Sequence, residues 1–322
     1  MATRTILVVH AHRALPAADE DETSSAHPVA VGSSVVRVGT TSWADRDLIN
    51  AGTFYPRRSM TARQRLEHYC ARLSLAEVTT TYRFPPTPEV SAQWAARTPP
   101  GFVLDVRAWS LLSSAPTLPD SLWPDLHGEV SPEKRDNRRL YPGHLSADGL
   151  EECWARFAHA LEPLRDAGRL GVVVFSYPGW FRPGPPAWRE LFLLPQRLPG
   201  CQLAVELPNR HWFEEAACET PLAPMEEQGL GLVCVDGPSA DQAGPPVLAA
   251  TASTALLRLR GRRGAQADHW TPYRYSHGDL ESLRGAICEL ASSAHEVHVV
   301  VDGGSAVHAA ENALALNDLL AG

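Results

Sequence analysis

The stretch HVVVDGGSAVHAAENALAL, His298 to Leu316, contains in one passage the two-part pattern that decides the fold. An apolar run of valines at 299–301 stops at Asp302, which two glycines follow. Ser305 then precedes a segment with helical spacing, and serine is a favoured N-cap residue. A strand that ends in an acid and glycines just before a helix is a common ligand position. The stretch therefore predicts a buried strand, a turn able to hold a ligand, and a helix.

The same order of a short apolar run and a longer helical segment recurs along the chain from residue 35 onward. Runs rich in β-branched residues indicate strands, and apolar residues spaced by three or four indicate helices. Strands are expected at 35–40, 75–81, 102–108, 170–177, 201–207, 231–236, 255–261 and 296–302. Helices are expected at 61–73, 86–97, 148–166, 185–197, 213–228, 278–293 and 305–320. The alternation predicts an α/β fold with a parallel sheet, and eight strands with a terminal helix favour a closed, TIM-barrel-like β/α barrel.

A doubly wound nucleotide-binding sheet is the main alternative fold. It requires a glycine-rich fingerprint after the first strand, and GTTSWAD at 39–45 is not one. The sequence also contains no Walker loop, no Gly-x-Ser-x-Gly elbow and no His-Glu-x-x-His zinc helix. No set of acids and histidines has the spacing of a metal site, so we expect neither a metal nor a cofactor.

Two segments fall outside the alternation. Residues 1–34 are acidic, small and polar without a periodic apolar face, so we expect a disordered N-terminal extension. Residues 35–322 then form a single barrel domain. Within it, residues 110–147 are rich in proline and polar residues, and we expect them to lie over the barrel as a long loop insert.

The composition narrows the class of protein. Of the 322 residues, 44% are hydrophobic and 20% are charged, which is ordinary for a globular protein with a sizeable core. A net charge of −8 disfavours binding to nucleic acid or to an anionic membrane, and no apolar run is long enough to span a bilayer. The six cysteines are scattered without a close pair, and no signal peptide is recognisable. We therefore expect a cytoplasmic protein with reduced thiols.

The ends of the expected strands carry an unusual number of charges. In a β/α barrel the functional groups lie at the C-terminal ends of the strands, which we call the mouth. Crowded carboxylates there can act as general acid and base, and arginines can bind a carboxylate or a phosphate. The same groups can instead form an internally neutralised network, because buried charges must be paired whatever the function. The acids are Glu77, Glu206, Asp236 and Asp302, and the arginines are Arg107, Arg258 and Arg260.

Among these acids, Glu206 and Asp236 follow strongly apolar central strands and are the favoured catalytic pair, with Asp302 as a third candidate. For both aspartates a turn-capping role before glycine is the simpler alternative. Further candidates for contacting a substrate stand near the strand ends, and each has a structural alternative such as core packing or simple solvation. They are Tyr82, Ser176, Tyr177, His211 and Trp43.

Several of these strings resemble the YecE-like family (domain of unknown function 72). They include VGTTSWADRDLINAGTFYP at 38–56, LEPLRDAGRLGVVVFSYPGWF at 161–181, LAVELPNRHWF at 203–213 and VHVVVDGGSAVHAAENALAL at 297–316. The resemblance runs in order from about residue 36 to residue 320 and looks closest to an actinobacterial type. It implies a TIM-barrel-like fold but no settled reaction.

The departures from the family pattern cluster at the strand ends. Arg83 stands where a tyrosine is usual, Ser176 where a glutamine is usual, Arg260 where a histidine is usual, and Asp302 where an asparagine is usual. The apolar strand interiors still match the family. This distribution indicates that the residues at the mouth have changed while the residues that build the barrel have been kept.

Two functions remain open on the sequence. The first is an enzyme that acts on a small anionic or polar metabolite, in secondary metabolism, by acid–base chemistry of the isomerase, lyase, dehydratase or cyclase type. Glu77, Arg83 and the mouth arginines would then help to bind the substrate. The second is a non-catalytic ligand-binding pseudo-enzyme of the same fold. The sequence leaves the oligomeric state open, and metal-dependent phosphodiester cleavage is disfavoured by the acidic net charge and the lack of a histidine cluster.

Overall fold

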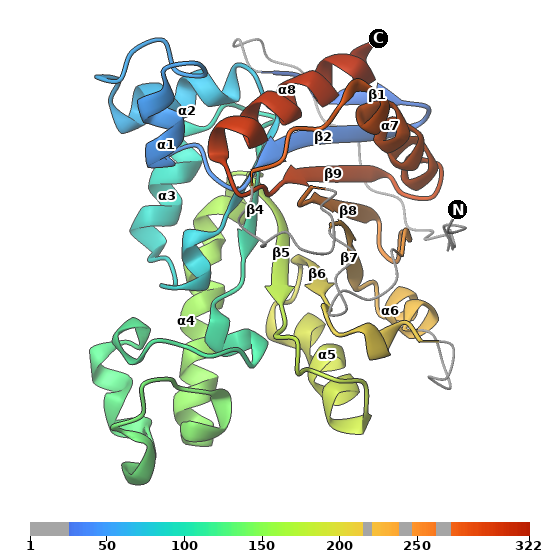
Figure 1. The fold of residues 1–322 in the computed structure, drawn as a ribbon. Helices are drawn as coiled ribbons and strands as arrows, with labels where there is room; N and C mark the ends of the chain where they lie inside the picture. The colour runs from blue at the N-terminus through green and yellow to red at the C-terminus, as the bar shows by residue number, and fades with distance from the viewer. Residues whose placement is uncertain (1–25, 215–220, 238–246, 262–271) are drawn as a thin grey trace.

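The computed structural model describes residues 26–214, 221–237, 247–261 and 272–322, and these form a closed barrel (Figure 1). Each strand pairs with the next one along the chain, and β2 also pairs in parallel with β9, so the sheet closes on itself. The parallel strands are β2 (Ser34–Thr40), β3 (Leu75–Val78), β4 (Val103–Arg107), β5 (Leu170–Ser176), β6 (Gln202–Glu206), β7 (Gly231–Asp236), β8 (Thr254–Leu259) and β9 (Glu296–Val301). The expected TIM-barrel-like α/β fold is confirmed.

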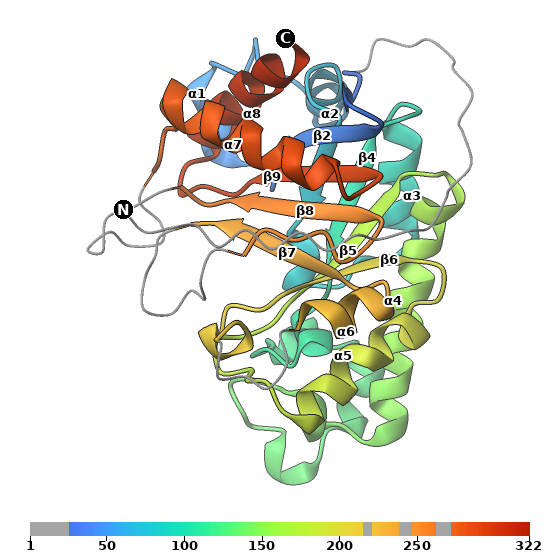
Figure 2. The same cartoon turned by 90° about the vertical axis from the view of Figure 1, so that its right-hand side faces the viewer.

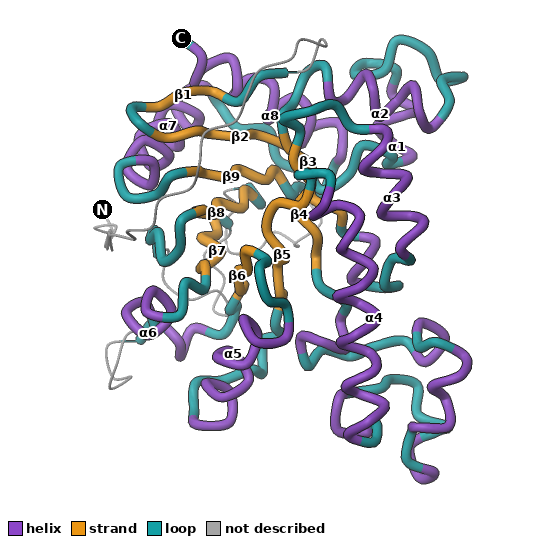
Figure 3. Tube along the Cα trace, turned by 180° about the vertical axis from the view of Figure 1, so that it is seen from behind, coloured by secondary structure: helices purple, strands orange, loops and turns teal. Residues whose placement is uncertain are grey.

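The helices surround the strands on the outside of the barrel (Figures 2 and 3). Within the described residues they are α1 (Arg46–Ala51), α2 (Ala62–Cys70), α3 (Pro88–Arg97), α4 (Ala147–Asp166), α5 (Pro185–Arg197), α6 (Leu222–Glu227), α7 (His277–Ala291) and α8 (Ala306–Ala321). Their ends follow the cap residues: Thr61 and Gln64 form a capping box at α2, and Ser305 caps α8 by accepting a hydrogen bond from the His308 amide. The helix expected at 213–228 is shorter, and its residues 215–220 lie outside the described part.

The N-terminal boundary differs from the expectation. Residues 26–34 belong to the fold, and β1 (Val29–Val31) pairs antiparallel with the first half of β2. Strand β3 pairs only with the last two residues of β2, so β1 covers the part of that edge that β3 does not reach. Ser34, expected in a disordered tail, is buried, and its hydroxyl contacts the carbonyls of Ala291 and Ala294 at 2.6 Å. The expectation for residues 1–25 lies outside the described residues.

The insert after β4 is a packed element built from short 3-10 turns, where a loop over the barrel was expected. Its apolar side chains are part of the main core, among them Leu122, Leu126 and Leu140, and Trp109 contacts Trp123 edge-on. Two isolated β-bridges join separate parts of the insert, one between Thr117 and Leu140 and the other between Val130 and Leu145. Figure 1 shows the insert beside one end of α4, where it extends away from the strands. The apolar residues spaced among its prolines explain why it packs.

The interior of the barrel is divided between two kinds of side chain. An apolar cluster inside it comes from β5, β6, β7 and β8 and consists of Val172, Val174, Ala204, Val233 and Leu256. Strand alternation sends charged side chains of β3, β4, β8 and β9 to the same interior. Glu77, Asp105, Arg258 and His298 are buried there. The interior therefore holds a charged half beside an apolar half.

Candidate functional site

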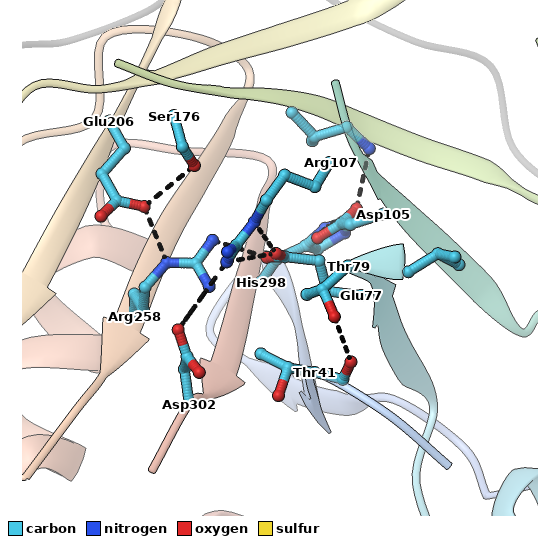
Figure 4. A network of polar contacts seen from close by, with 12 residues as sticks. Thr41, Glu77, Thr79, Asp105, Arg107, Ser176, Glu206, Arg258, His298 and Asp302 are labelled. Carbon is cyan, nitrogen blue, oxygen red and sulfur yellow. Dashed lines mark hydrogen bonds and ion pairs between the residues drawn. The ribbon is translucent and has the colours of Figure 1, made fainter. Parts of the chain in front are cut away.

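Charged side chains at or directly after the ends of five strands meet at the mouth of the barrel (Figure 4). Parallel strands bring their C-terminal ends to the same end of the barrel, so these residues lie close together. Strand alternation turns their side chains toward the barrel interior. We call this group the mouth cluster. It consists of Glu77 from β3, Arg107 from β4, Glu206 from β6, Arg258 from β8, Arg260 directly after β8, and Asp302 directly after β9.

Arg258 is the centre of the mouth cluster. Each of its guanidinium nitrogens contacts a different carboxylate: Nη2 lies 2.6 Å from Glu77, Nε 3.1 Å from Glu206 and Nη1 3.2 Å from Asp302. Its side chain is 1% exposed. Burial lowers the pKa of Arg258, but the three carboxylates outweigh this effect and raise it above its usual value. Arg258 is therefore a fixed cation that orients three acids.

The other two arginines stand closer to solvent. Arg107 binds the buried Glu77 through Nε at 2.8 Å and Nη2 at 2.7 Å, and its side chain is 16% exposed. Arg260 binds Glu206 through Nη2 at 2.6 Å, and its side chain is 35% exposed. Arg260 is thus the cation of the cluster that an incoming ligand reaches most readily.

Asp302 is held differently from the other two carboxylates. Its Oδ2 atom lies 3.2 Å from Arg258, 3.5 Å from Arg260 and 3.7 Å from Arg107, so a single oxygen faces all three arginines. The Asp302 side chain is 26% exposed, whereas that of Glu206 is 6% exposed. Asp302 is therefore the carboxylate of the cluster with the longest contacts and the greatest exposure.

The arginines lower the pKa of the mouth acids. Burial alone raises the pKa of Glu206, but Arg260, Arg258 and Arg107 lower it to about 2. The pKa of Asp302 is also lowered, since the same arginines outweigh its burial. Both groups are carboxylates at neutral pH in the structure as it stands, and neither is a general acid in this state.

Asp236, Tyr82 and Ser176 border the mouth cluster. The Asp236 carboxylate accepts a hydrogen bond from the Tyr275 hydroxyl at 3.1 Å, and its backbone carbonyl accepts from the Arg260 amide at 2.8 Å. Ser176 donates to Glu206 at 3.4 Å. Burial raises the pKa of Tyr82, which also experiences the charges of Arg107 and Glu206. Ser176 and Asp236 are the last residues of β5 and β7, whereas Tyr82 lies in the 3-10 turn that follows β3.

Other candidates from the sequence lie elsewhere. Tyr177 is 3% exposed and stacks on Phe181 with ring centroids 4.1 Å apart, in the core outside the barrel. Trp43 packs edge-on against Trp94 of α3. Arg83 is exposed, and the ring of His211 pairs with Glu214 at 2.8 Å. The structure does not bring these four residues into the mouth cluster.

Sequence reasoning missed a second charged group, deeper in the barrel. His298 Nδ1 lies 3.0 Å from both oxygens of Asp105, and Nε2 lies 3.3 Å from Glu296, which also pairs with Arg37. Asp105 also accepts a hydrogen bond from the Val172 amide at 2.7 Å, where the β4–β5 register shifts. The sequence carried one signal for this group. Asp105 lies two positions before Arg107 on the same strand, and residues two positions apart on a strand face the same side of the sheet.

The described residues contain no group of three or more His, Cys, Asp or Glu side chains arranged to hold a metal ion. Within the same residues, no helix has the length and apolar character needed to cross a membrane.

Comparisons with known proteins agree with the barrel. The curated protein UPF0759 protein YunF of Bacillus subtilis (strain 168) is 23% identical over 298 residues, which cover 89% of this chain and 95% of that protein. A crystal structure of a DUF72 family protein from Enterococcus faecalis V583 superposes with a TM-score of 0.70 at 23% identity, covering 88% and 95% of the two chains. One from Thermotoga maritima MSB8 gives 0.68 at 24% identity, covering 88% and 98%. The family model described as "Protein of unknown function DUF72" matches residues 37–322, and the chain therefore belongs to the DUF72 family.

Proposed function

We propose that this chain is an enzyme that binds a small anionic or polar metabolite at the barrel mouth and acts on it by acid–base chemistry. The observation that carries the proposal is the convergence of three arginines and three carboxylates at the C-terminal strand ends, with Arg260 and Asp302 partly exposed. Charged groups fixed in place by a rigid barrel are suited to stabilising charge that develops in a reaction.

The proposed base is Asp302. Its carboxylate is partly exposed and lies beside the arginines that would stabilise an enolate or another oxyanion. The arginines lower its pKa and so weaken it as a base. An anionic substrate that engages Arg107 and Arg260 would offset their positive charge, and the pKa of Asp302 would then rise. Substrate binding would in this way strengthen the base.

Glu206 takes a supporting role in this proposal. Its pKa of about 2 and its two arginine partners make it a fixed anion that orients Arg258 and Arg260. The chemistry requires one base, one proton donor and a stabiliser of negative charge, as in isomerases, lyases, dehydratases and cyclases. We place the proton donor on the side of the mouth where the Tyr275 hydroxyl contacts the Asp236 carboxylate.

The test is exchange of carbon-bound hydrogen with solvent. The protein is incubated in D2O with a panel of small 2-oxo and 3-hydroxy carboxylates, and loss of the C–H signal is followed by proton NMR. We expect exchange in at least one compound and a decrease of about 10²-fold or more in Asp302→Asn. Glu151→Gln, which removes a carboxylate from an exposed ion pair with Arg197, serves as the control and should exchange as the wild type does. Equal exchange in Asp302→Asn would contradict the assignment of the base.

A second candidate function is ligand binding without catalysis. The observation that favours it is that all three guanidinium nitrogens of Arg258 already lie within ion-pair distance of carboxylates of the protein itself. Such a network also forms when its role is only to shape a binding surface. Ligands that stabilise the protein but show no exchange in the same panel would favour this function over the enzyme.

A further inference from the structure

We infer that the Asp302 side chain occupies the position at which a carboxylate of the ligand binds, and that it yields this position on binding. The inference rests on the proposed function and adds the class of the ligand. A single oxygen of Asp302 faces Arg258, Arg260 and Arg107 at 3.2, 3.5 and 3.7 Å. Three guanidinium groups around one oxygen form an anion-binding point, and here the chain supplies the anion.

Asp302 is the carboxylate of the mouth cluster best able to leave its place. Glu77 is fully buried and has arginine contacts of 2.6 and 2.7 Å, and Glu206 has a contact of 2.6 Å. The Asp302 contacts are longer, and its side chain is the most exposed of the three. Breaking these contacts therefore costs less than breaking those of the two glutamates.

The backbone at Asp302 allows the side chain to move while the strand stays in place. The Asp302 amide donates to the Leu259 carbonyl at 2.8 Å, which fixes the end of β9 against β8. Two glycines follow, and a Cβ on Gly303 would meet only the Ser305 carbonyl, at 3.9 Å. Rotation about the Asp302 side-chain bonds would move its carboxylate away from the three arginines while the end of β9 stays in place.

Charge balance selects a carboxylate over a phosphate. The mouth cluster contains three arginines and three carboxylates, whose formal charges cancel. When a singly charged carboxylate replaces Asp302 among the arginines, the buried part of the cluster stays neutral. A doubly charged phosphate would leave one uncompensated negative charge beside Glu77 and Glu206, which is costly where solvent is excluded.

The test removes the internal carboxylate and supplies it again from solution. Asp302→Ala is titrated with sodium formate, sodium chloride and sodium phosphate at matched ionic strength, and the melting temperature is recorded. We expect saturable stabilisation by formate, at an apparent affinity on the order of tenfold above that of the wild type, because the tethered competitor is gone. Chloride and phosphate should stabilise less. The double variant Asp302→Ala/Arg260→Gln should lose the formate effect.

Asp125→Ala is the matched control, since Asp125 pairs with Arg156 on the surface away from the mouth. Formate should affect this variant no more than the wild type. If Asp302→Ala does not fold, Asp302→Ser, which also removes the charge and vacates the position among the arginines, takes its place. Equal effects of chloride and formate, or stronger binding of phosphate, would overturn the carboxylate assignment. A formate effect that persists without Arg260 would overturn the site. None of these measurements involves turnover, so their failure is distinct from a negative result in the exchange assay.

Discussion

Asp105 and His298 belong to strands that are not neighbours in the barrel, yet their side chains meet across its interior at 3.0 Å. His298 also faces Glu296 with its other ring nitrogen, at 3.3 Å. An imidazole that faces a carboxylate on each side is held with both nitrogens protonated. The pair thus places a buried imidazolium below the mouth cluster and joins β9 to β4 through the centre of the molecule.

The first prediction concerns alkaline pH. Burial lowers the pKa of His298, but Asp105 and Glu296 outweigh this and raise it from 6.5 to about 9. The stability that this shift contributes is fully present below pH 6.5 and is lost as the pH rises through about 9, since the folded state binds the proton more tightly. We expect the free energy of unfolding to fall by roughly 3 kcal/mol over this window.

Urea unfolding at several pH values from 6 to 10 checks this expectation. His298→Gln should be less stable at pH 6 and should lack the decrease, because no proton is bound at this position. His159→Gln, which alters an exposed pair with Glu162, should keep the wild-type profile. A wild-type profile that stays flat up to pH 9 would contradict a charged His298.

The second prediction concerns acid. The pKa of Glu206 is lowered from 4.5 to about 2, so its contribution to stability is present above pH 4.5 and is lost as the pH falls through about 2. Glu206→Gln should therefore be less stable than the wild type at pH 7, and the two should converge near pH 2. Guanidinium unfolding over this range measures the difference, and a difference that does not depend on pH would show that lost packing, not lost charge, is the cause.

The third prediction concerns the space beside Asp105. A Cβ on Gly171 would collide with Asp105 Oδ1 and lie 2.5 Å from Val103 Cγ1 and 3.3 Å from His298 Cε1. Gly171→Ala should therefore destabilise the fold by about 1–3 kcal/mol, because the pair must move or the strands must part. Gly285→Ala is the matched control: it lies on α7, where an added Cβ would meet no atom within 4 Å, and should be neutral or stabilising by up to about 1 kcal/mol. Equal effects of the two substitutions would contradict this role of Gly171.

Much of the fold was predictable from local patterns. The strand expected at 231–236 is β7, because a β-branched run between turn residues fixes both of its ends. Strand β1 was not predicted, because a strand of three residues is too short to show a periodic hydrophobic pattern. The strand expected at 75–81 is shorter: β3 ends at Val78, because the chain turns into a 3-10 helix over Thr80–Tyr82.

Only the part of the site that follows from strand alternation and from the shared end of parallel strands could be predicted. Parallel strands place their ends together, and this brought Arg107, Glu206, Arg258 and Asp302 to one mouth. The same rule explains the misplacement of Tyr177, which is one residue beyond Ser176 and so faces the other side of the sheet. The contact of Asp105 with His298 lies across the barrel, and no local pattern encodes a partner 193 residues away.

The last prediction concerns the centre of the mouth cluster. Arg258→Lys keeps the charge but offers one nitrogen in place of three, so at least one of Glu77, Glu206 and Asp302 loses its contact with this side chain. Because Glu77 and Glu206 are buried, we expect a loss of about 2–4 kcal/mol in the free energy of unfolding at pH 7. Arg156→Lys is the matched control, since Arg156 also joins two carboxylates, Asp125 and Glu152, but on the surface. There the loss should stay below about 1 kcal/mol. Similar losses of unfolding free energy in the two variants would contradict the expectation that the buried arginine contributes more to stability than the exposed one.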